Sequence, residues 1–489
     1  MMTTFSASRN PPAPFRGFDP LAGAWLDKVI AAIAVMALFV TPLQMLRLAT
    51  ALPESVNLTV AGVFCLAATA VAWFFCAGLS RLSESLAKGI SRLPLTAWIV
   101  IGLALRLAWI ALFPATPGSD GAAYLSLAQS WMDTGQYYAE NCFAYWPVGY
   151  PLFLTFWLRL CPSASVAILA ANLFLFALGA CGVGRLTRLL AGAEAERVAA
   201  ALFALWPNLI ANSATPEKET LVVALLPWAA AFLYRALTQR RASSALAGGA
   251  LLGMATLVQP SLQFIPFLGA GVLFAVFMRR KGALLLPLAL LLGAAVVVAP
   301  WTIRNYRVFD RFVLVATNGG SNLYRANNPL ATGGYTERGE VDLSGLSEIE
   351  EDRMGRKLAV EWILGHPANF GALALEKLIR FMGDDAGGVY ATFKVGKASD
   401  DGRLYAACKA AANGWWMAVW FALAALVFFR WRKGEARGRP ALLVTWFWLY
   451  LLVLHAVFES AGKYHVPMLW APCVLLAALV CATDRRGAA

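Results

Sequence analysis

Long apolar runs alternate with short polar connections along most of the 489-residue chain. A helix needs about 20 consecutive apolar residues to cross the ~30 Å hydrocarbon core of a bilayer, so each long run predicts a membrane-spanning helix. We predict about twelve such helices from the distribution of apolar residues. They lie near 29–48, 56–79, 96–113, 164–184, 197–213, 219–237, 244–259, 262–278, 283–301, 415–430, 441–458 and 466–482. The pattern therefore predicts an all-α polytopic membrane protein.

One further apolar run, "WPVGYPLFLTFWLRL" at 146–160, is short and contains Pro147 and Pro151. Counting it as a crossing would move every later basic cluster to the opposite side of the membrane. We therefore expect a juxtamembrane helix on the outer face, with Trp146 and Tyr150 at the membrane interface.

Basic residues fall in every second connection between the predicted helices. The connections on the side of the N-terminus carry clusters of Arg and Lys, whereas the stretch 114–158 contains neither. Cytoplasmic loops carry the excess of Lys and Arg in membrane proteins, so both termini are expected to be cytoplasmic. The net charge of +13 thus follows the membrane topology and does not predict a nucleic-acid partner.

The alternation of sides divides the chain into four regions. A cytoplasmic N-terminal tail and two additional transmembrane helices occupy 1–95, and a transmembrane core that includes the first outer loop (114–163) occupies 96–301. An extracytoplasmic loop or cap follows at 302–414, and the last transmembrane helices and a short cytoplasmic tail occupy 415–489. Amphipathic patterns at 347–364 and 367–383 predict helices in the cap, because a structureless loop of that length is uncommon.

The first outer loop contains "TPGSDGAAYLSLAQSW" (116–131), in which Asp120 follows an apolar run with no Lys or Arg nearby. One interpretation is an N-cap, in which Ser119 or Asp120 opens a helix near Gly121. The other is a general base that takes a proton from an acceptor hydroxyl or amine at the membrane surface. Tyr124 lies one helical turn after Asp120, on the same face, and is a candidate substrate contact.

A second pair of acids lies in "NSATPEKETLVVALLPW" (212–228), where Glu217 and Glu219 flank Lys218 at the outer start of a predicted span. Acids early in a helix suit its dipole, which is a purely structural explanation. Alternatively, Glu219 points into the bundle and joins Asp120 at one site, with Lys218 as a substrate contact.

Two arginines are further candidates. Arg304 in "APWTIRNYRVFDRF" (299–312) follows the apolar run and precedes Tyr306. The two residues either anchor the helix at the interface or bind a lipid phosphate, which the planar guanidinium suits. Arg106 lies in the middle of a predicted span, where a charge is costly, so we expect it to pair with an acid or to neutralise a pyrophosphate-like head group.

The last outer connection, "HAVFESAGKYHVPMLW" (455–470), brings Lys463, Tyr464 and His465 close to Glu459. A cation in a short outer loop breaks the charge bias that the other short loops obey. We therefore interpret Lys463, Tyr464 and His465 as substrate-binding residues, with Lys463 and Arg304 facing one bound phosphate.

Several kinds of chemistry lack support in the sequence. There is no P-loop, no HExxH and no GxSxG motif, which argues against ATP-driven transport and metalloproteolysis. Only three His residues are present, so a His-rich metal site is not expected.

Taken in order, the motifs resemble those of the GT-C glycosyltransferases, and most closely the bacterial protein-mannosyltransferase/aminoarabinose-transferase-like (family 39-like) branch. The resemblance covers about 96–482 and rests on "SDGAAY", "WPVGYPLF", "PEKETL", "PWTIRNY", "NGGSNLYRANNPLATGGY" and "KYHVP". It implies a GT-C fold in the bacterial inner membrane, with the active site on the periplasmic side. It also implies inverting transfer of a hexosyl or pentosyl group from a polyprenyl-phosphate donor, such as undecaprenyl phosphate, to a glycan, lipid or protein acceptor.

The resemblance also assigns roles to residues. It makes Asp120 the proposed base and matches Glu219, better than Glu217, to a second acid. Lys463-Tyr464 stand where the family usually has Arg-Tyr, which keeps the charge but loses the bidentate fork. No cofactor is implied beyond the donor, and a metal-free mechanism is preferred over one with a divalent metal.

Two alternatives remain open. One is an O-antigen ligase-like or polymerase-like enzyme, for which His366 is an available histidine. The other is a transporter or flippase of lipid-linked sugars, although that class favours charges in mid-membrane and two comparable halves.

Overall fold

The computed structural model describes residues 21–139, 142–336, 339–434 and 440–484, and within them the chain is helical and contains no β-sheet. The N-terminal half contains α1 (Leu21–Ala49), α2 (Glu54–Phe74), α3 (Cys76–Ile90), α4 (Leu95–Leu112), α5 (Ser119–Thr134), α6 (Gly149–Leu160), α7 (Ala164–Ala191), α8 (Ala193–Ala204), α9 (Pro207–Ala211), η1 (Asn212–Ala214) and α10 (Lys218–Gln239). The remainder contains α11 (Ala242–Val258), η2 (Pro260–Leu262), α12 (Ile265–Phe277), α13 (Leu285–Phe309), α14 (Gly319–Ala326), α15 (Glu348–Gly365), α16 (Pro367–Met382), α17 (Gly387–Tyr390), η3 (Ala391–Val395), α18 (Gly402–Arg432), α19 (Pro440–Val457), η4 (Gly462–Met468) and α20 (Trp470–Asp484).

Eight helices in the described part of the chain are long and apolar enough to cross a membrane, and the bent pair η4–α20 would make nine. Two shorter apolar helices, Ala242–Val258 and Val444–Val457, match further predicted crossings. The prediction of an all-helical, multi-pass membrane protein is confirmed, while the total of about twelve spans stays a prediction.

The crossing predicted at 197–213 is wrong as a single helix. The chain forms α8, stops at Leu205 and Trp206, and resumes as the five-residue α9 at Pro207. Proline has no N–H for the helical ladder and clashes with the preceding turn, so it is favoured at the first position of a helix, where Pro207 lies. The break carries Trp206 and Asn208 into the interior of the protein.

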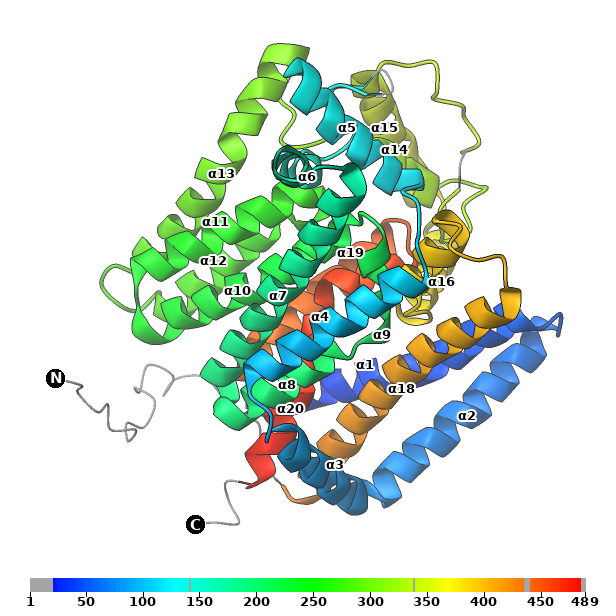
Figure 1. Ribbon diagram of the computed structural model, residues 1–489, viewed down its shortest axis with the longest axis vertical. Coiled ribbons are helices and arrows are strands. Elements are labelled where there is room, and N and C mark those ends of the chain that lie inside the picture. Colours follow the sequence, from blue (N-terminus) through cyan, green and yellow to red (C-terminus); the bar gives the residue numbers. More distant parts are fainter. Residues whose placement is uncertain (1–20, 140–141, 337–338, 435–439, 485–489) are drawn as a thin grey trace.

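The run at 146–160 forms the short helix α6, which packs against α5, α7 and α11. Figure 1 shows α5, α6, α14 and α15 at one end of the bundle, opposite the end at which α3 and α20 lie. The two amphipathic helices predicted for the cap are present as α15 and α16. Ser347 and Glu350 form a capping box at the start of α15, which satisfies backbone N–H groups of its first turn.

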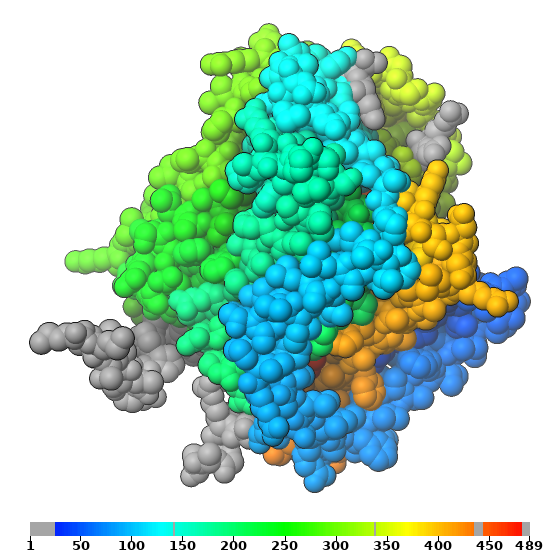
Figure 2. Space-filling view, in the orientation of Figure 1, coloured from blue at the N-terminus to red at the C-terminus, as the bar shows by residue number. Residues whose placement is uncertain are grey.

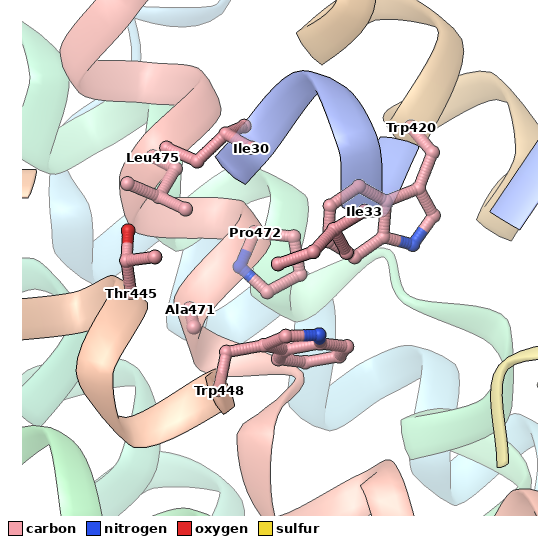
Figure 3. A pocket seen from close by; sticks show the side chains of 8 residues that line it. All are labelled: Ile30, Ile33, Trp420, Thr445, Trp448, Ala471, Pro472 and Leu475. Atoms are coloured by element: carbon pink, nitrogen blue, oxygen red, sulfur yellow. The ribbon is translucent and has the colours of Figure 1, made fainter. Parts of the chain in front are cut away.

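The N-terminal helices are packed into the rest of the protein. Helix α1 lies along α18 and also contacts α16, and α2 packs on both α1 and α18. A small apolar pocket forms where α1, α18, α19 and α20 meet, with Ile30, Trp420, Trp448 and Pro472 in its wall (Figure 3). Regions 1–95 and 415–489 therefore share one hydrophobic core.

Candidate active site

An ion pair joins two outer connections that are far apart in the sequence. Nζ of Lys463, in η4, donates a hydrogen bond to Oδ2 of Asp120, in the first turn of α5, at 2.9 Å. The N-cap position of α5 is Gly118, and no side chain caps this helix. The N-cap interpretation of Ser119 and Asp120 is therefore wrong, because the Asp120 carboxylate faces Lys463.

The start of α10 lies against the same turn of α5. A Cβ atom on Gly121 would come within 3.1 Å of the Pro216 ring, so glycine permits this close approach. Glu219 is buried, while Glu217 and Lys218 are partly exposed. The contact places the acids of α10 beside Asp120.

Electrostatic interactions show that these groups form one cluster. Burial, followed by repulsion from Glu219, raises the pKa of Glu217, and Lys463 acts in the opposite direction. Burial also favours a higher pKa for Asp120, but Lys463 and then Lys218 outweigh it and hold that pKa below its usual range. Asp120 is therefore a carboxylate at neutral pH, with two cations acting on it.

Tyr124 lies beneath the cluster and is almost fully buried. Its ring makes edge contacts with Trp146 and Tyr150, which form an aromatic wall. Its hydroxyl has no hydrogen-bond partner among the described residues, and burial and then Asp120 raise its pKa. A buried hydroxyl without a partner is costly, so this one is available to a bound molecule.

The Tyr464 ring lies 5.4 Å from the ammonium of Lys463, and its hydroxyl reaches the acid of its own loop. Its hydroxyl donates to Oε1 of Glu459 at 2.6 Å, and its ring stacks on His455. The second oxygen of Glu459 is buried and has no partner in the described part of the chain.

His465 is fully buried and both of its ring nitrogens face groups of the protein, which leaves neither for the substrate contact that the sequence suggested. Its Nε2 atom lies 2.9 Å from Oδ1 of Asp385, and its Nδ1 atom faces the carbonyl oxygen of Phe381. Asp385 was not among the predicted site residues. The available signal was the acid pair in "MGDDAGG", directly after a predicted amphipathic helix.

Arg106 is also occupied by contacts within the protein. It is 1% exposed, donates to the carbonyl oxygens of Gly102 and Ala204, and stacks 3.6 Å from the centre of the Phe176 ring. Ala204 ends α8, so Arg106 satisfies a carbonyl at a helix terminus. The expected acidic partner is not among its hydrogen bonds.

Arg304 holds the first outer loop in place. Its guanidinium donates to the carbonyl oxygens of Phe143 and Tyr137, at 2.7 and 3.1 Å, and lies over the ring of Trp301. Tyr306 is exposed at the end of α13. The guanidinium of Arg304 is therefore occupied by the first outer loop. Of the predicted site residues, the structure brings together Asp120, Tyr124, Lys218, Glu219 and Lys463.

An open groove of about 540 Å³ lies near that loop, with Phe143, Phe309, Arg311, Glu348 and Arg353 among its lining residues. Neither this groove nor the apolar pocket in Figure 3 includes Asp120 or Lys463. The candidate site is thus defined here by its converging charges.

No group of three or more His, Cys, Asp or Glu side chains arranged to hold a metal ion occurs in the described ranges. Asp120, Glu217 and Glu219 act on one another electrostatically, but Lys218 and Lys463 lie among them. The two ammonium groups therefore offset part of the negative charge of the three acidic side chains.

Comparisons with solved structures return distant relatives. ArnT from Cupriavidus metallidurans bound to undecaprenyl phosphate is 15% identical over 78% of this chain and 60% of that chain, with a TM-score of 0.46. The arabinosyltransferase EmbB from Mycobacterium smegmatis is 14% identical over 88% and 45%, with a TM-score of 0.34. The oligosaccharyltransferase of Archaeoglobus fulgidus, in complex with Zn and sulfate, is 15% identical over 75% and 53%, with a TM-score of 0.32. The chain spans 60% or less of the length of each of these three proteins.

A search of curated proteins gives no match. The family model described as dolichyl-phosphate-mannose-protein mannosyltransferase matches residues 146–303, which include α6, α7 and the acids at the start of α10. Over those residues, the resemblance that the motifs predict is confirmed: this part of the chain has the sequence pattern of the dolichyl-phosphate-mannose-protein mannosyltransferase family.

Proposed function

We propose that the protein is an integral membrane glycosyltransferase that moves a sugar from a polyprenyl-phosphate donor to a hydroxyl or amine acceptor on the extracytoplasmic side. The observation that carries the proposal is the Lys463–Asp120 pair, 2.9 Å apart, beside the buried Glu219. A carboxylate can accept the proton of the acceptor, and an ammonium group can stabilise the negative charge of a phosphate leaving group. Phosphate-linked donors need no general acid, since the phosphate leaves readily at neutral pH.

The proposed reaction is a single displacement. The acceptor oxygen or nitrogen forms a bond to the anomeric carbon while the bond from that carbon to the phosphate oxygen breaks, which inverts the configuration. The acceptor proton passes to Asp120, and the electron pair of the broken bond stays on the polyprenyl phosphate. A positioned carboxylate supplies typically about 10²–10⁴-fold in rate through such proton transfer.

In the structure, Asp120 and Lys463 neutralise each other. We infer that the donor phosphate replaces Asp120 as the partner of Lys463, which frees the carboxylate to accept a proton. Lys218, whose charge acts on Asp120, is the second cation available to the phosphate. Charges fixed where negative charge develops contribute most when water is excluded, and the aromatic wall of Trp146 and Tyr150 lies beside Tyr124.

Three roles remain part of the proposal. Glu219 is the second acid of the site, Tyr124 offers its buried hydroxyl to the substrate, and Tyr464 orders the loop that carries Lys463. The proposal needs no metal ion, and it places both termini in the cytoplasm, as the distribution of basic residues predicts. It includes neither Arg106 nor Arg304, because backbone carbonyls and aromatic rings occupy their guanidinium groups.

The direct experiment is mass spectrometry of lipid-linked sugars in cells that lack the protein. Accumulation of one polyprenyl-phosphate sugar, reversed by the wild-type gene but not by an Asp120→Asn version, is the expected result. An unchanged pool of polyprenyl-phosphate sugars, together with a change in diphosphate-linked oligosaccharides, would instead favour the ligase or flippase alternatives.

A further inference from the structure

A second pair of ionisable side chains, which includes a residue of the same short helix as Lys463, is completely buried. Asp385 and His465 each have no exposed surface. Oxygens of Asp385 also accept hydrogen bonds from the indole N–H of Trp206 and the amide of Asn208, and its backbone N–H donates to Asn413. Every polar atom of this carboxylate thus has a partner, as a buried charge requires.

The hydrogen-bond partners fix the orientation of the His465 ring. The Nδ1 atom of His465 faces the carbonyl of Phe381, which only accepts, so Nδ1 carries a proton. The other ring nitrogen, Nε2, faces Oδ1 of Asp385 at 2.9 Å, so a proton between these two atoms joins them in a hydrogen bond. The His465 ring also stacks on Trp416, with centres 4.7 Å apart and planes 8° from parallel, which holds the plane of the imidazole.

The contacts connect this buried pair to the reactive one. His465 follows Lys463 by two residues on η4, so fixing its ring fixes that short helix. The residue before Lys463 is Gly462, where a Cβ atom would lie 1.8 Å from the carbonyl oxygen of Asp384. Asp384 is itself held in place, because Nζ of Lys409 donates a hydrogen bond to its Oδ2 atom at 2.7 Å. The backbone at Asp384 therefore packs closely against the start of η4.

The hydrogen-bond partners of Asp385 come from other parts of the chain. Trp206 lies in the break between α8 and α9, Asn208 lies in the first turn of α9, and Asn413 belongs to α18. The interruption of the predicted span by Pro207 therefore has a consequence, because it directs two donors at Asp385.

We propose that the Asp385–His465 pair is a positioning device that holds η4 so that the ammonium group of Lys463 faces Asp120. Asp385 and His465 touch no substrate and act through Lys463. A buried polar pair of this kind contributes little net stability compared with apolar residues, and its best-attested use is to specify one arrangement of the chain. The test of this inference by donor KM rests on the proposed function, whereas the test by chemical modification of Lys463 does not.

The geometric test measures how fast an amine-specific acetylating reagent modifies Lys463 in the purified full-length protein, with peptides quantified by mass spectrometry. Asp120→Asn removes the carboxylate partner of Lys463, so its acetylation rate serves as the reference for an unpaired Lys463 amine. Asp385→Asn is expected to raise the acetylation rate of Lys463 to within about threefold of that reference. A rate equal to that of the wild type, with Asp120→Asn raised, overturns the proposal.

Matched tryptophan variants supply the control. Trp206→Phe removes the indole donor to Asp385, and Trp228→Phe removes an indole donor to the carbonyl of Leu178, at 2.9 Å, between α10 and α7. Only Trp206→Phe is expected to raise the acetylation rate of Lys463. Equal rates in the two variants would show that any loss of an interhelical hydrogen bond has the same effect, which also overturns the proposal. These variants keep the test informative if substitutions of Asp385 fail to fold.

The catalytic test separates positioning from general stability. With an undecaprenyl-phosphate sugar as donor, Asp385→Asn is expected to raise the donor KM about tenfold, the loss of roughly one charge-assisted hydrogen bond. In a Lys463→Met background, the same substitution is expected to raise KM no further. An equal rise in both backgrounds contradicts positioning through Lys463. Faster acetylation with an unchanged donor KM leaves positioning intact and contradicts the proposed phosphate role of Lys463.

Discussion

The side chains of Asp120 and Lys463 meet at 2.9 Å although 343 residues separate them in the sequence. The contact joins the first outer loop to the last one. The acids at the start of α10 lie close enough to this pair to interact with it electrostatically. Figure 2 shows that α4 and the start of α5 share a face with the segment that follows α16. On that face, the N–H of Thr116 donates to the carbonyl of Gly396 at 3.0 Å. Distant loops are therefore joined around a small group of charges.

The first prediction concerns the carboxylate. Asp120→Asn keeps the shape of the side chain but removes the proton acceptor, so we expect kcat to fall by about 10²–10⁴-fold, the usual contribution of general base catalysis. Turnover of the purified enzyme in lipid measures this. Donor binding is expected to persist, because Lys463 is released from its partner. An Asn variant with wild-type kcat would remove Asp120 from the reaction.

The second prediction concerns the ammonium group. Lys463→Arg retains the charge and offers a phosphate two parallel N–H donors, whereas Lys463→Met retains only the apolar stem. We expect the donor KM to rise at least about tenfold in the Met variant, and the Arg variant to stay within about threefold of the wild type. Acceptor KM serves as the internal control and is expected to stay constant. A donor KM that is equal in the Met and wild-type enzymes would exclude Lys463 as a phosphate ligand.

Much of the architecture was predictable from hydropathy and charge. Apolar runs located most of the helices, and the absence of Lys and Arg from 114–158 made Asp120 stand out in the sequence alone. The amphipathic pattern at 347–364 predicted the helix that forms as α15. These features are local, so a single stretch of sequence contains all the information that they need.

The sequence predictions failed where the hydrogen-bond partners of a side chain are backbone groups or residues distant in the sequence. Arg106 was expected to find an acid, but its partners are carbonyl oxygens, which every residue carries and no sequence pattern reveals. Asp385 was missed because its donors come from α9, η4 and the residue before α9. Pro207 did signal the break in the span at 197–213, and the hydropathy of the run obscured it.

The third prediction concerns Arg106. Arg106→Met keeps the apolar volume against Phe176 but leaves the carbonyl of Ala204 without a donor. We expect the protein to lose about 1–3 kcal/mol of stability, the cost of one unsatisfied buried group. The unfolding temperature of the purified variant measures the loss. A changed donor KM with unchanged thermal stability would return Arg106 to the substrate site.

The fourth prediction uses the buried Lys377 of α16 as a probe of the cap. Its ammonium donates to Asn327 and to the carbonyl of Val457, both at 2.8 Å, with no carboxylate among these partners. Burial lowers the pKa of Lys377 to about 8, below the usual value of about 10.4. Between those values the unfolded chain binds more protons than the folded one, so this residue makes stability rise with pH across that window.

The unfolding temperature between pH 7.5 and 10 tests this sign. We expect the wild type to lose less stability over that range than Lys377→Met, in which the favourable contribution of deprotonation is absent. Lys357→Met is a suitable control, because that lysine is exposed and pairs with Glu361 on the surface of α15. If Lys377→Met and Lys357→Met change in parallel with pH, the ammonium of Lys377 titrates as it does in water, and the cap does not hold it in an apolar environment.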